Sequence, residues 1–298
     1  MVASYVDVLL ALWSRQGDDA ASARTYQSIK AAIESDAALR IRSVEVYLQG
    51  SYANATNISG DSDVDIVVQS GTTFRPEYRE QVLPYERVLL ENSFGPAQYN
   101  YAAFRGDVAR ALRRAFPART QEGNKALKVA ATHGQVNADV VPAFDYRLYY
   151  RRDWFETGMV FWARDGEMFV NFPKQHRANG EAKNGRCNGN FKPTVRILKN
   201  LRNALYESGA LPEDSVPSYY LECLVSNAAD VKFHPNNLRQ RVDDVLADLA
   251  SALIAREHGW GNEIMSLNGI IPLFGDGNTQ WNTTDARAFV GAARAWLA

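Results

Sequence analysis

Two aspartates spaced two residues apart, Asp63 and Asp65, are the residues of this sequence best suited to chemistry. They stand at the start of a largely apolar run, Val64 to Val68, that is typical of a buried β-strand. Because side chains alternate along a strand, both carboxylates lie on one face. Two carboxylates so close together repel each other unless a cation neutralises them, and hard oxygen ligands suit Mg²⁺ bridged to substrate phosphates. The pair therefore predicts a metal-assisted reaction on a phosphorylated substrate.

A second motif, Gly50-Ser51, follows the predicted strand Val44 to Leu48. A glycine has no Cβ, so backbone N–H groups there can approach an anion, and a helix that begins at this turn adds its positive dipole end. Gly50-Ser51 therefore predicts a phosphate-binding turn upstream of the two aspartates. The alternative is that these aspartates and Asp61 form an ordinary acidic turn between strands. The phosphate-binding turn upstream and a third acid downstream favour the functional interpretation.

The third acid is Asp139, in a β-rich run from Val136 to Val141. Burying an unpaired carboxylate among apolar neighbours is unfavourable, so Asp139 needs a partner. A metal ion shared with Asp63 and Asp65 is one such partner. The alternative is a carboxylate at the exposed edge of the hairpin that Ala126 to Thr132 forms with this run.

Groups that could bind phosphates recur later in the chain. Pro217-Ser218-Tyr219 opens a predicted helix, where the hydroxyl of Ser218 and free N–H groups could meet an anion. Taken alone this is a weak signal, because serine is also a common N-cap residue. The preceding helix carries cations at three- and four-residue intervals, which places them on one face that is either basic and solvated or turned to a phosphate: Lys192, Arg196, Lys199 and Arg202.

Hydrophobic periodicity divides the chain into two parts. Residues 1–173 mix helices and strands and residues 174–298 are helical, so we expect a mixed α/β lobe that includes the N-terminal helices, followed by a helical lobe. Thr72 to Glu80 is polar and contains proline, which predicts a loop. The predicted helices run over Tyr5 to Ser14 with Ser4 as N-cap, Ala21 to Leu39, Gln81 to Asn92, Tyr101 to Phe116, Lys174 to Lys183, Lys192 to Ser208, Ser218 to Asn227, Leu238 to Ala255 and Asp285 to Leu297, and further strands over Arg147 to Tyr150, Met159 to Ala163 and Glu167 to Asn171.

The composition is that of an ordinary globular protein. Hydrophobic residues make up 46% of the 298 residues, and the net charge of −1 provides no overall basic field to attract nucleic acid. Cys187 and Cys223 are the only cysteines and are far apart, so neither a disulfide framework nor a cysteine-rich zinc site is expected. The start, Met1 to Trp13, lacks the positive region of a signal peptide, and no stretch reaches the length of a membrane span. We expect a cytoplasmic protein.

These motifs together resemble a known family. Gly50-Ser51, Asp63-Val64-Asp65 and a separate strand aspartate, Asp139, resemble the DNA-polymerase-β-like nucleotidyltransferase superfamily. The longer string that includes Asp139-Val140-Val141-Pro142 and Pro217-Ser218-Tyr219 is similar to the CD-NTases, the bacterial relatives of cyclic GMP-AMP synthase. The resemblance implies an α+β fold, in which a polymerase-β-like catalytic lobe with a mixed sheet, 1–173, packs against a helical lobe, 174–298, that completes the nucleotide site.

The resemblance also implies a role for each site residue. Asp63, Asp65 and Asp139 would be catalytic and hold two Mg²⁺ ions, which Mn²⁺ could replace, and Asp139 would help to activate the acceptor hydroxyl. Gly50, Ser51, Lys199 and Ser218 would bind the triphosphate, and Tyr219 would stack on a base. The animal enzyme senses DNA through a zinc insertion that needs Cys and His, so zinc-dependent DNA sensing is not expected here.

The implied function is template-independent synthesis of a cyclic di- or trinucleotide from NTPs, ATP among them, as a second messenger that acts on a separate effector in anti-phage signalling. One alternative is a linear oligonucleotide synthase of the 2′-5′ oligoadenylate type or an RNA-extending nucleotidyltransferase, although a net charge of −1 argues against a long basic groove. Another is a nucleotide-binding scaffold without activity, against which the intact set of three acids argues. In the family that this chain resembles, some members are attached to other molecules through their C-terminal residue, which requires a free tail. The amphipathic segment Asp285 to Leu297 predicts a docked terminal helix instead, so we expect regulation by a non-covalent protein partner or ligand.

Overall fold

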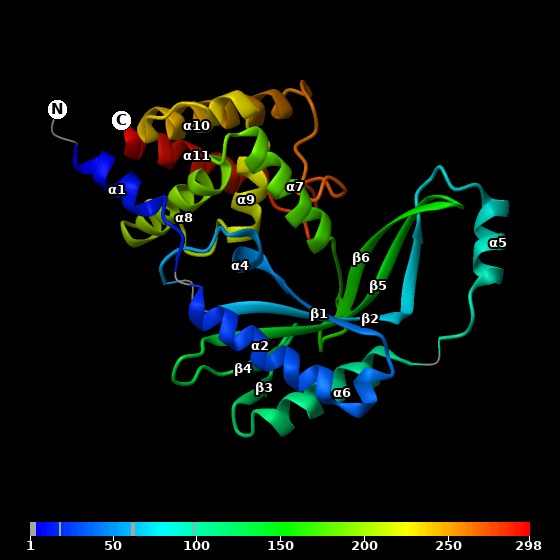
Figure 1. Ribbon diagram of the computed structural model, residues 1–298. Helices are drawn as coiled ribbons and strands as arrows, with labels where there is room; N and C mark the ends of the chain where they lie inside the picture. The colour runs from blue at the N-terminus through cyan, green and yellow to red at the C-terminus, as the bar shows by residue number, and fades with distance from the viewer. Residues whose placement is uncertain (1–3, 18, 61–62, 98) are drawn as a thin grey trace. The chain divides into compact units, whose positions relative to one another are not determined.

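The structure is a computed structural model in which residues 4–17, 19–60, 63–97 and 99–298 are described. Asp61 and Ser62 of the aspartate motif and the first three residues of the chain lie outside these ranges. The chain divides into two compact units, which are coloured along the sequence in Figure 1. One unit, the sheet unit, comprises Asp18–Gly50 and Ser62–Pro173; the other, the helical unit, comprises Met1–Gly17, Ser51–Asp61 and Lys174–Ala298.

The sheet unit is built on a mixed sheet. Its seven strands, within the described residues, run in the order β1-β2-β5-β4-β3, and β6 pairs with both β5 and β7. The pairing of β2 with β5 is parallel, and the other pairings are antiparallel. The strands are β1 (Val44–Gln49), β2 (Asp63–Tyr78), β3 (Thr120–Glu122), β4 (Leu127–Val129), β5 (Asn137–Arg151), β6 (Trp154–Trp162) and β7 (Met168–Asn171).

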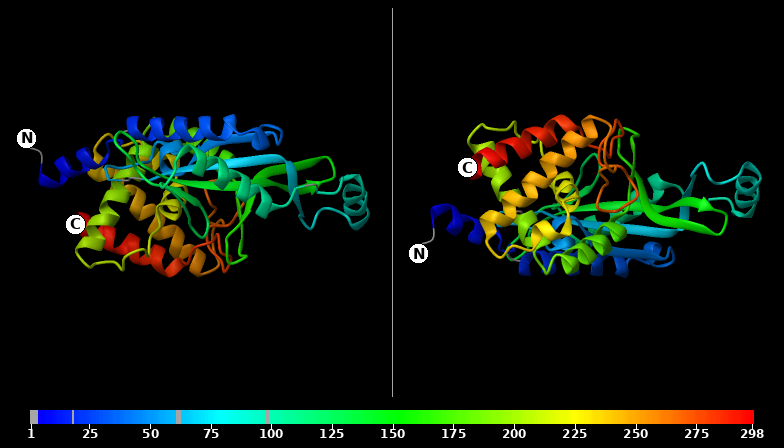
Figure 2. Two further views of the ribbon diagram at one scale, coloured as in Figure 1. Left: turned by 90° about the horizontal axis from the view of Figure 1, so that it is seen from below. Right: turned by 90° about the horizontal axis from the view of Figure 1, so that it is seen from above.

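Helices lie against this sheet and at its far end. In Figure 1, α2 (Ala20–Ser35) and α6 (Tyr101–Ala115) run side by side, and α2 contacts β1 and β2 while α6 contacts β5. The ring of Phe104 on α6 stacks on Phe144 of β5, with centroids 5.3 Å apart. Helix α5 (Pro84–Ser93) packs through Leu90 at the far end of β5, where both views of Figure 2 show it. Helices α2 and α6 therefore pack on the part of the sheet that contains β2 and β5.

The helical unit has one large apolar core. The fully buried side chains of Leu10, Leu198, Leu246 and Phe289 belong to it, each from a different helix. Burial of such side chains is the main favourable term in the folding of this unit. The helices are α1 (Tyr5–Trp13), α7 (Pro173–Arg186), α8 (Phe191–Glu207), α9 (Ser218–Ser226), α10 (Leu238–Glu257) and α11 (Thr283–Leu297), with the short α4 (Gly50–Asn54) and the 3₁₀ turn η1 (Asp230–Phe233).

The predicted fold class is confirmed: the chain is an α+β protein with a mixed sheet and a C-terminal helical part. The predicted hairpin around His133-Gly134-Gln135 is also confirmed, because β4 pairs antiparallel with β5. One division between the two units falls after Pro173, but residues 1–17 and 51–61 also belong to the helical unit, so the predicted lobes 1–173 and 174–298 stay a prediction. Helix α1 differs from the expectation, since Leu10 is buried in the core of the helical unit and Trp13 packs against that core. The apolar face of α1 is therefore buried among helices, whereas the sequence analysis placed it with the sheet.

Two predicted elements are wrong in detail. The segment Thr72 to Glu80 is not a loop, because β2 continues to Tyr78 and, after a register shift that follows Ser70, pairs with β5 from Phe74 to Tyr78. Pro76 is tolerated there because the pairing of β2 with β1 ends at Ser70, so the missing N–H is on an edge. The predicted helix Ala21 to Leu39 is interrupted at Asp36, whose carboxylate accepts hydrogen bonds from the backbone N–H groups that open α3 (Ala37–Arg40).

Candidate active site

The three predicted catalytic acids lie on two neighbouring strands. In the parallel register of β2 and β5, Asp65 is the partner of Asp139 and Asp63 is the partner of Asn137. Paired residues of adjacent strands point to the same side, and so do residues two apart on one strand. All three acids therefore share one face of the sheet. Since β5 lies between β2 and β4, Asp139 is on an inner strand, which argues against the alternative of an exposed hairpin edge.

The groups around Asp139 shift its pKa in opposite directions. Partial burial raises the pKa of Asp139, the ammonium of Lys128 lowers it, and the carboxylate of Asp63 raises it again. Asn137 steadies the first acid, because its Nδ2 donates a hydrogen bond to Oδ1 of Asp63 over 3.1 Å. The resulting site favours a proton or a cation at Asp139.

Lys128 was missed by the sequence analysis. Strand β4 pairs it directly with Asp139, and its side chain is exposed. The sequence could have indicated Lys128, because it lies on the predicted strand that forms a hairpin with the strand of Asp139. In the structure its positive charge lowers the pKa of Asp139, against the effect of burial.

Gly50 joins strand β1 to helix α4 and has a φ of +68°, a left-handed conformation that favours glycine. A Cβ atom on Gly50 would lie 2.3 Å from Oδ2 of Asp65. The glycine therefore makes room for the carboxylate of Asp65, a reason that the sequence analysis did not give. Helix α4 has five residues, so its dipole is weak, and anion binding by Ser51 would depend on nearby N–H groups and cations.

The donor set fits a hard divalent cation. Carboxylate oxygens are the ligands that Mg²⁺ prefers, and three carboxylates share the face. In the part of the chain that the structure describes, however, no three acidic, histidine or cysteine side chains converge closely enough to form a finished metal cluster. Asp63, Asp65 and Asp139 would therefore have to turn toward a bound ion. Their arrangement agrees with mutual repulsion between like charges.

The basic row of α8 is buried rather than solvated, although such a helix face is usually exposed. Lys199 is 1% exposed, and its Nζ donates a hydrogen bond to the carbonyl oxygen of Thr56 over 3.0 Å. Arg196 donates from Nη1 to the carbonyl oxygen of Ala55 over 2.6 Å and from Nε to that of Ser14. Two cations thus support the backbone that follows α4. Contact of Lys199 with a triphosphate stays a prediction.

Ser218 and Tyr219 begin α9. The N-cap position is held by Pro217, and the hydroxyl of Ser218 accepts a hydrogen bond from Nη1 of Arg202 over 2.9 Å. Ser218 is therefore not the cap residue of this helix. Tyr219 is 39% exposed, which leaves part of its ring open to a stacking partner. Its predicted contact with a base stays a prediction.

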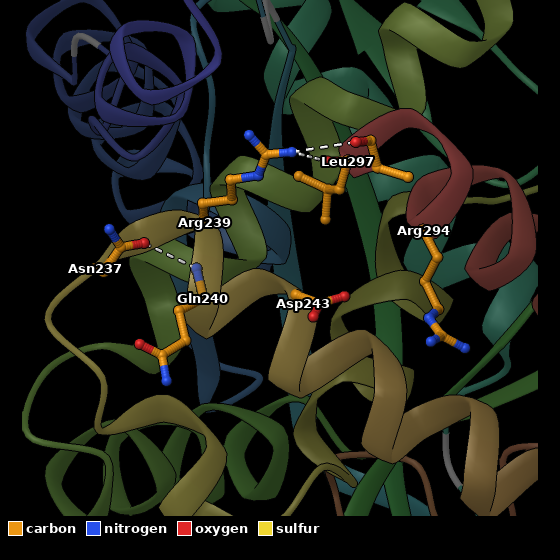
Figure 3. Close-up of a pocket in the computed structure, with 7 residues that line it drawn as sticks. Asn237, Arg239, Gln240, Asp243, Arg294 and Leu297 are labelled. Atoms are coloured by element: carbon orange, nitrogen blue, oxygen red, sulfur yellow. Dashed lines mark hydrogen bonds between the residues drawn. The ribbon is translucent and has the colours of Figure 1, made fainter. Parts of the chain in front are cut away.

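A pocket elsewhere in the helical unit involves none of these residues. It lies between the start of α10 and the end of α11, where Arg239 donates hydrogen bonds to the carbonyl oxygens of Leu297 and Ala298 (Figure 3). Arg294 points away from this contact in the same view. The predicted terminal helix is confirmed, since α11 buries Phe289 in the core of the unit.

The fold and the acidic face define a nucleotidyltransferase. Residues 178–298 match the family model described as the cGAS/DncV-like nucleotidyltransferase C-terminal helical domain. The chain is 35% identical to the cyclic nucleotide synthase CdnE01 of Staphylococcus haemolyticus, over 93% of each protein. It is 38% identical to the cyclic UMP-AMP synthase of Rhodothermus marinus, over 93% of this chain and 92% of that protein. The chain therefore belongs to the CD-NTase family, as the resemblance in its motifs indicated.

Solved structures agree with this assignment. The CdnE c-UMP-AMP synthase of Rhodothermus marinus, solved with Apcpp and Upnpp, is similar at a TM-score of 0.86 and 36% identity, over 97% of this chain and 95% of that chain. The CdnE cyclic dinucleotide synthase of Elizabethkingia meningoseptica, solved with GTP and Apcpp, gives a TM-score of 0.80 at 26% identity, over 99% of both chains. Within the described residues of our protein, no helix is long and apolar enough to cross a membrane.

Proposed function

We propose that this protein joins NTPs into a cyclic di- or trinucleotide without a template, and that the product acts on a separate effector in anti-phage signalling. The observation that carries the proposal is the register of Asp65 and Asp139 on parallel strands, with Asp63 on the same face. Similarity to cyclic nucleotide synthases over 93% of the chain supports a cyclic rather than a linear product. It also argues against an inactive scaffold.

The chemistry is transfer of a nucleotidyl group. The hydroxyl of an acceptor nucleotide attacks the α-phosphorus of a donor NTP, a new P–O bond forms, and pyrophosphate leaves. For a cyclic dinucleotide, a second attack of the same kind within the linear intermediate closes the ring and releases a second pyrophosphate; a cyclic trinucleotide needs one more addition before closure and releases three pyrophosphates. Each attack removes one proton from a hydroxyl, and the carboxylate of Asp139, whose pKa burial raises, is suited to accept that proton.

Mg²⁺ is the cation that we propose for the acidic face, with Mn²⁺ as a substitute. Asp63, Asp65 and Asp139 would hold two ions, which when bound stabilise negative charge on the attacking and leaving oxygens. Asn137 keeps the carboxylate of Asp63 in place through its hydrogen bond. The absence of a side chain at Gly50 leaves the space that Asp65 needs.

The remaining predicted residues bind the nucleotides. Gly50 and Ser51 would bind the triphosphate through backbone N–H groups, with Ser218 as a further hydroxyl ligand. Lys199 donates a hydrogen bond to the carbonyl oxygen of Thr56. Its positive charge would therefore attract phosphates bound at this turn even without a direct hydrogen bond to them. Tyr219 would stack on a base through the exposed part of its ring.

We expect ATP among the substrates. A relative with 38% identity is named a cyclic UMP-AMP synthase, so UTP and ATP are the first pair to test. Incubation of the purified protein with each labelled NTP and with all four, in Mg²⁺ or Mn²⁺, followed by phosphatase treatment and mass spectrometry, tests the proposal. A phosphatase-resistant cyclic product is the expected result. Phosphatase-sensitive linear products would favour the linear synthase, and no product in either metal would contradict the proposed function.

Regulation by a non-covalent protein partner or ligand belongs to the same proposal. Phe289 and Leu297 are buried, and Arg239 holds the carbonyl oxygens of the last two residues, which supports a helix α11 that stays docked.

A further inference from the structure

Three buried polar residues of the helical unit, His176, Glu222 and Thr56, are linked into a chain by hydrogen bonds. None of them has a role in the chemistry above. Nε2 of His176 on α7 lies 3.1 Å from Oε1 of Glu222 on α9. The second carboxylate oxygen, Oε2, accepts a hydrogen bond from Oγ1 of Thr56 over 2.9 Å. The three residues are only 4%, 5% and 0% exposed. Glu222 therefore uses both oxygens to tie a helix to the segment that follows α4.

One end of this chain reaches the surface at Tyr219. The rings of His176 and Tyr219 are stacked, with centroids 5.2 Å apart and an interplanar angle of 26°. Nδ2 of Asn268 donates a hydrogen bond to the hydroxyl of Tyr219 over 3.3 Å. The tyrosine is thus fixed from one face of its ring and from its hydroxyl, while 39% of the residue remains exposed.

The other end reaches the phosphate-binding turn. The backbone N–H of Thr56 donates a hydrogen bond to the carbonyl oxygen of Ser51 over 2.9 Å, and Lys199 donates to the carbonyl oxygen of Thr56. Thr56 is therefore held by its backbone to Ser51 and by its hydroxyl to Glu222. A shift of His176 or Glu222 would move both Tyr219 and the turn.

A buried ion pair needs a reason beyond stability. Removing two charges from water is unfavourable, and well-packed apolar residues often replace such a pair without loss of stability. Burial alone lowers the pKa of His176, but its interactions with Cys223 and Glu222 outweigh burial and raise the pKa to about 10. The hydrogen-bonded pair fixes direction and distance in a way that apolar packing does not.

We propose that His176 and Glu222 are positioning residues, which set the distance between the base-stacking ring of Tyr219 and the phosphate-binding turn at Ser51 through Thr56. The inference rests on the proposed function and adds to it the way in which base recognition and triphosphate recognition are coupled. A nucleotide that contacts both ends then meets a site whose spacing is already fixed. Such preorganisation lowers the entropy lost on binding.

A double-mutant cycle tests the coupling. Thr56→Val removes the hydroxyl bonded to Glu222, and Tyr219→Leu removes the stacking ring. For uncoupled sites the two increases in KM for the NTP multiply. For coupled sites we expect each single variant to raise KM about three- to thirtyfold, and the double variant to raise it little more than the worse single variant. The value of kcat should change less than KM in all three.

Repeating the cycle in variants of His176 and Glu222 tests whether these two residues couple Tyr219 to Thr56. His176→Phe keeps a ring against Tyr219 but cannot bond Glu222, and Glu222→Gln keeps the shape of the side chain without its charge. In the His176→Phe background the effects of Thr56→Val and Tyr219→Leu should become multiplicative. If that variant proves unfolded by its thermal melting curve, the Glu222→Gln background, with the same expectation, replaces it.

Lys183→Met is the matched control. Lys183 is also a buried charged residue of α7, bonded to Asp230 and to the carbonyl oxygen of Ala228, but it contacts neither Tyr219 nor Thr56 through any described hydrogen bond. It should lower the melting temperature and leave KM unchanged. If wild type makes the cyclic product and the effects of the cycle multiply in every background, the inference is overturned and the proposed function stands. If wild type neither binds nor converts NTPs, both are overturned.

Discussion

Gly50 lies so close to Asp65 that a Cβ atom on Gly50 would be 2.3 Å from Oδ2 of Asp65. No non-bonded contact is that short. The turn between β1 and α4 and the carboxylate on β2 therefore occupy adjoining space that only glycine leaves open. Register explains the closeness, because Gln49, the last residue of β1, is the partner of Asp65. The predicted phosphate-binding turn and the predicted metal-binding carboxylate therefore constrain each other sterically.

Gly50→Ala should abolish product formation, because the new methyl group must displace Asp65 or shift the turn. The left-handed φ of +68° adds strain of about 1–2 kcal/mol. Gly60→Ala is the matched control, since Gly60 has a φ of +96° and nothing within 4 Å of its Cβ position. This control should lose similar stability and keep its activity. Equal activity of the two variants in an NTP turnover assay would show that the contact with Asp65 does not matter.

Local patterns predicted the parts of the site that lie on single strands and turns. Alternation placed Asp63 and Asp65 on one face, and the cost of burying Asp139 alone suggested that it shares a cation with them. The register places Asp139 beside Asp65, while the shared cation stays a prediction. The strand segment Thr72 to Tyr78 was missed, because its stability comes from pairing with β5 rather than from its own apolar residues. Periodicity carries no information about such non-local pairing.

Contacts between distant residues could not be predicted in this way. Glu222 bonds His176, 46 residues away, and Thr56, 166 residues away. The burial of Lys199 depends on a carbonyl oxygen 143 residues earlier. A basic residue on a helix is usually solvated, so only the tertiary structure shows that this one supports the turn.

Asp63→Asn combined with Asp65→Asn should bring product formation below detection and leave the fold intact. Removing like charges that repel should keep the melting temperature or raise it slightly. Asp243→Asn combined with Asp244→Asn makes the same change in net charge on α10 and should keep full activity. Measurable synthesis by a clean preparation of the first double variant would refute the assignment of the acidic face as the metal site.

Lys199→Met should raise KM for the NTP more than it lowers kcat, because the ammonium acts on the phosphates by charge and not in the chemical step. It should also lower the free energy of unfolding by about 1–3 kcal/mol, since the carbonyl oxygen of Thr56 loses its donor in a buried place. Denaturant titration and steady-state kinetics measure the two effects. Lys183→Met is the control that separates stability from nucleotide binding, because it should lose stability with KM unchanged. An unaltered KM in Lys199→Met would exclude a role of Lys199 in nucleotide binding.

The pH dependence of stability should report the charge on His176. The pKa of His176 is about 10 in the folded protein against an ordinary value of 6.5, so the folded state binds this proton more tightly than the unfolded state does. The stabilisation is complete below pH 6.5 and is lost as the pH rises toward 10. The free energy of unfolding of wild type should therefore fall more steeply between these limits than that of His176→Phe, and the difference between the two curves should become constant at higher pH. Urea titrations of both proteins across this range measure the difference, with Lys183→Met expected to run parallel to wild type; curves of wild type and His176→Phe that stay parallel would show that the imidazole is neutral in the folded protein.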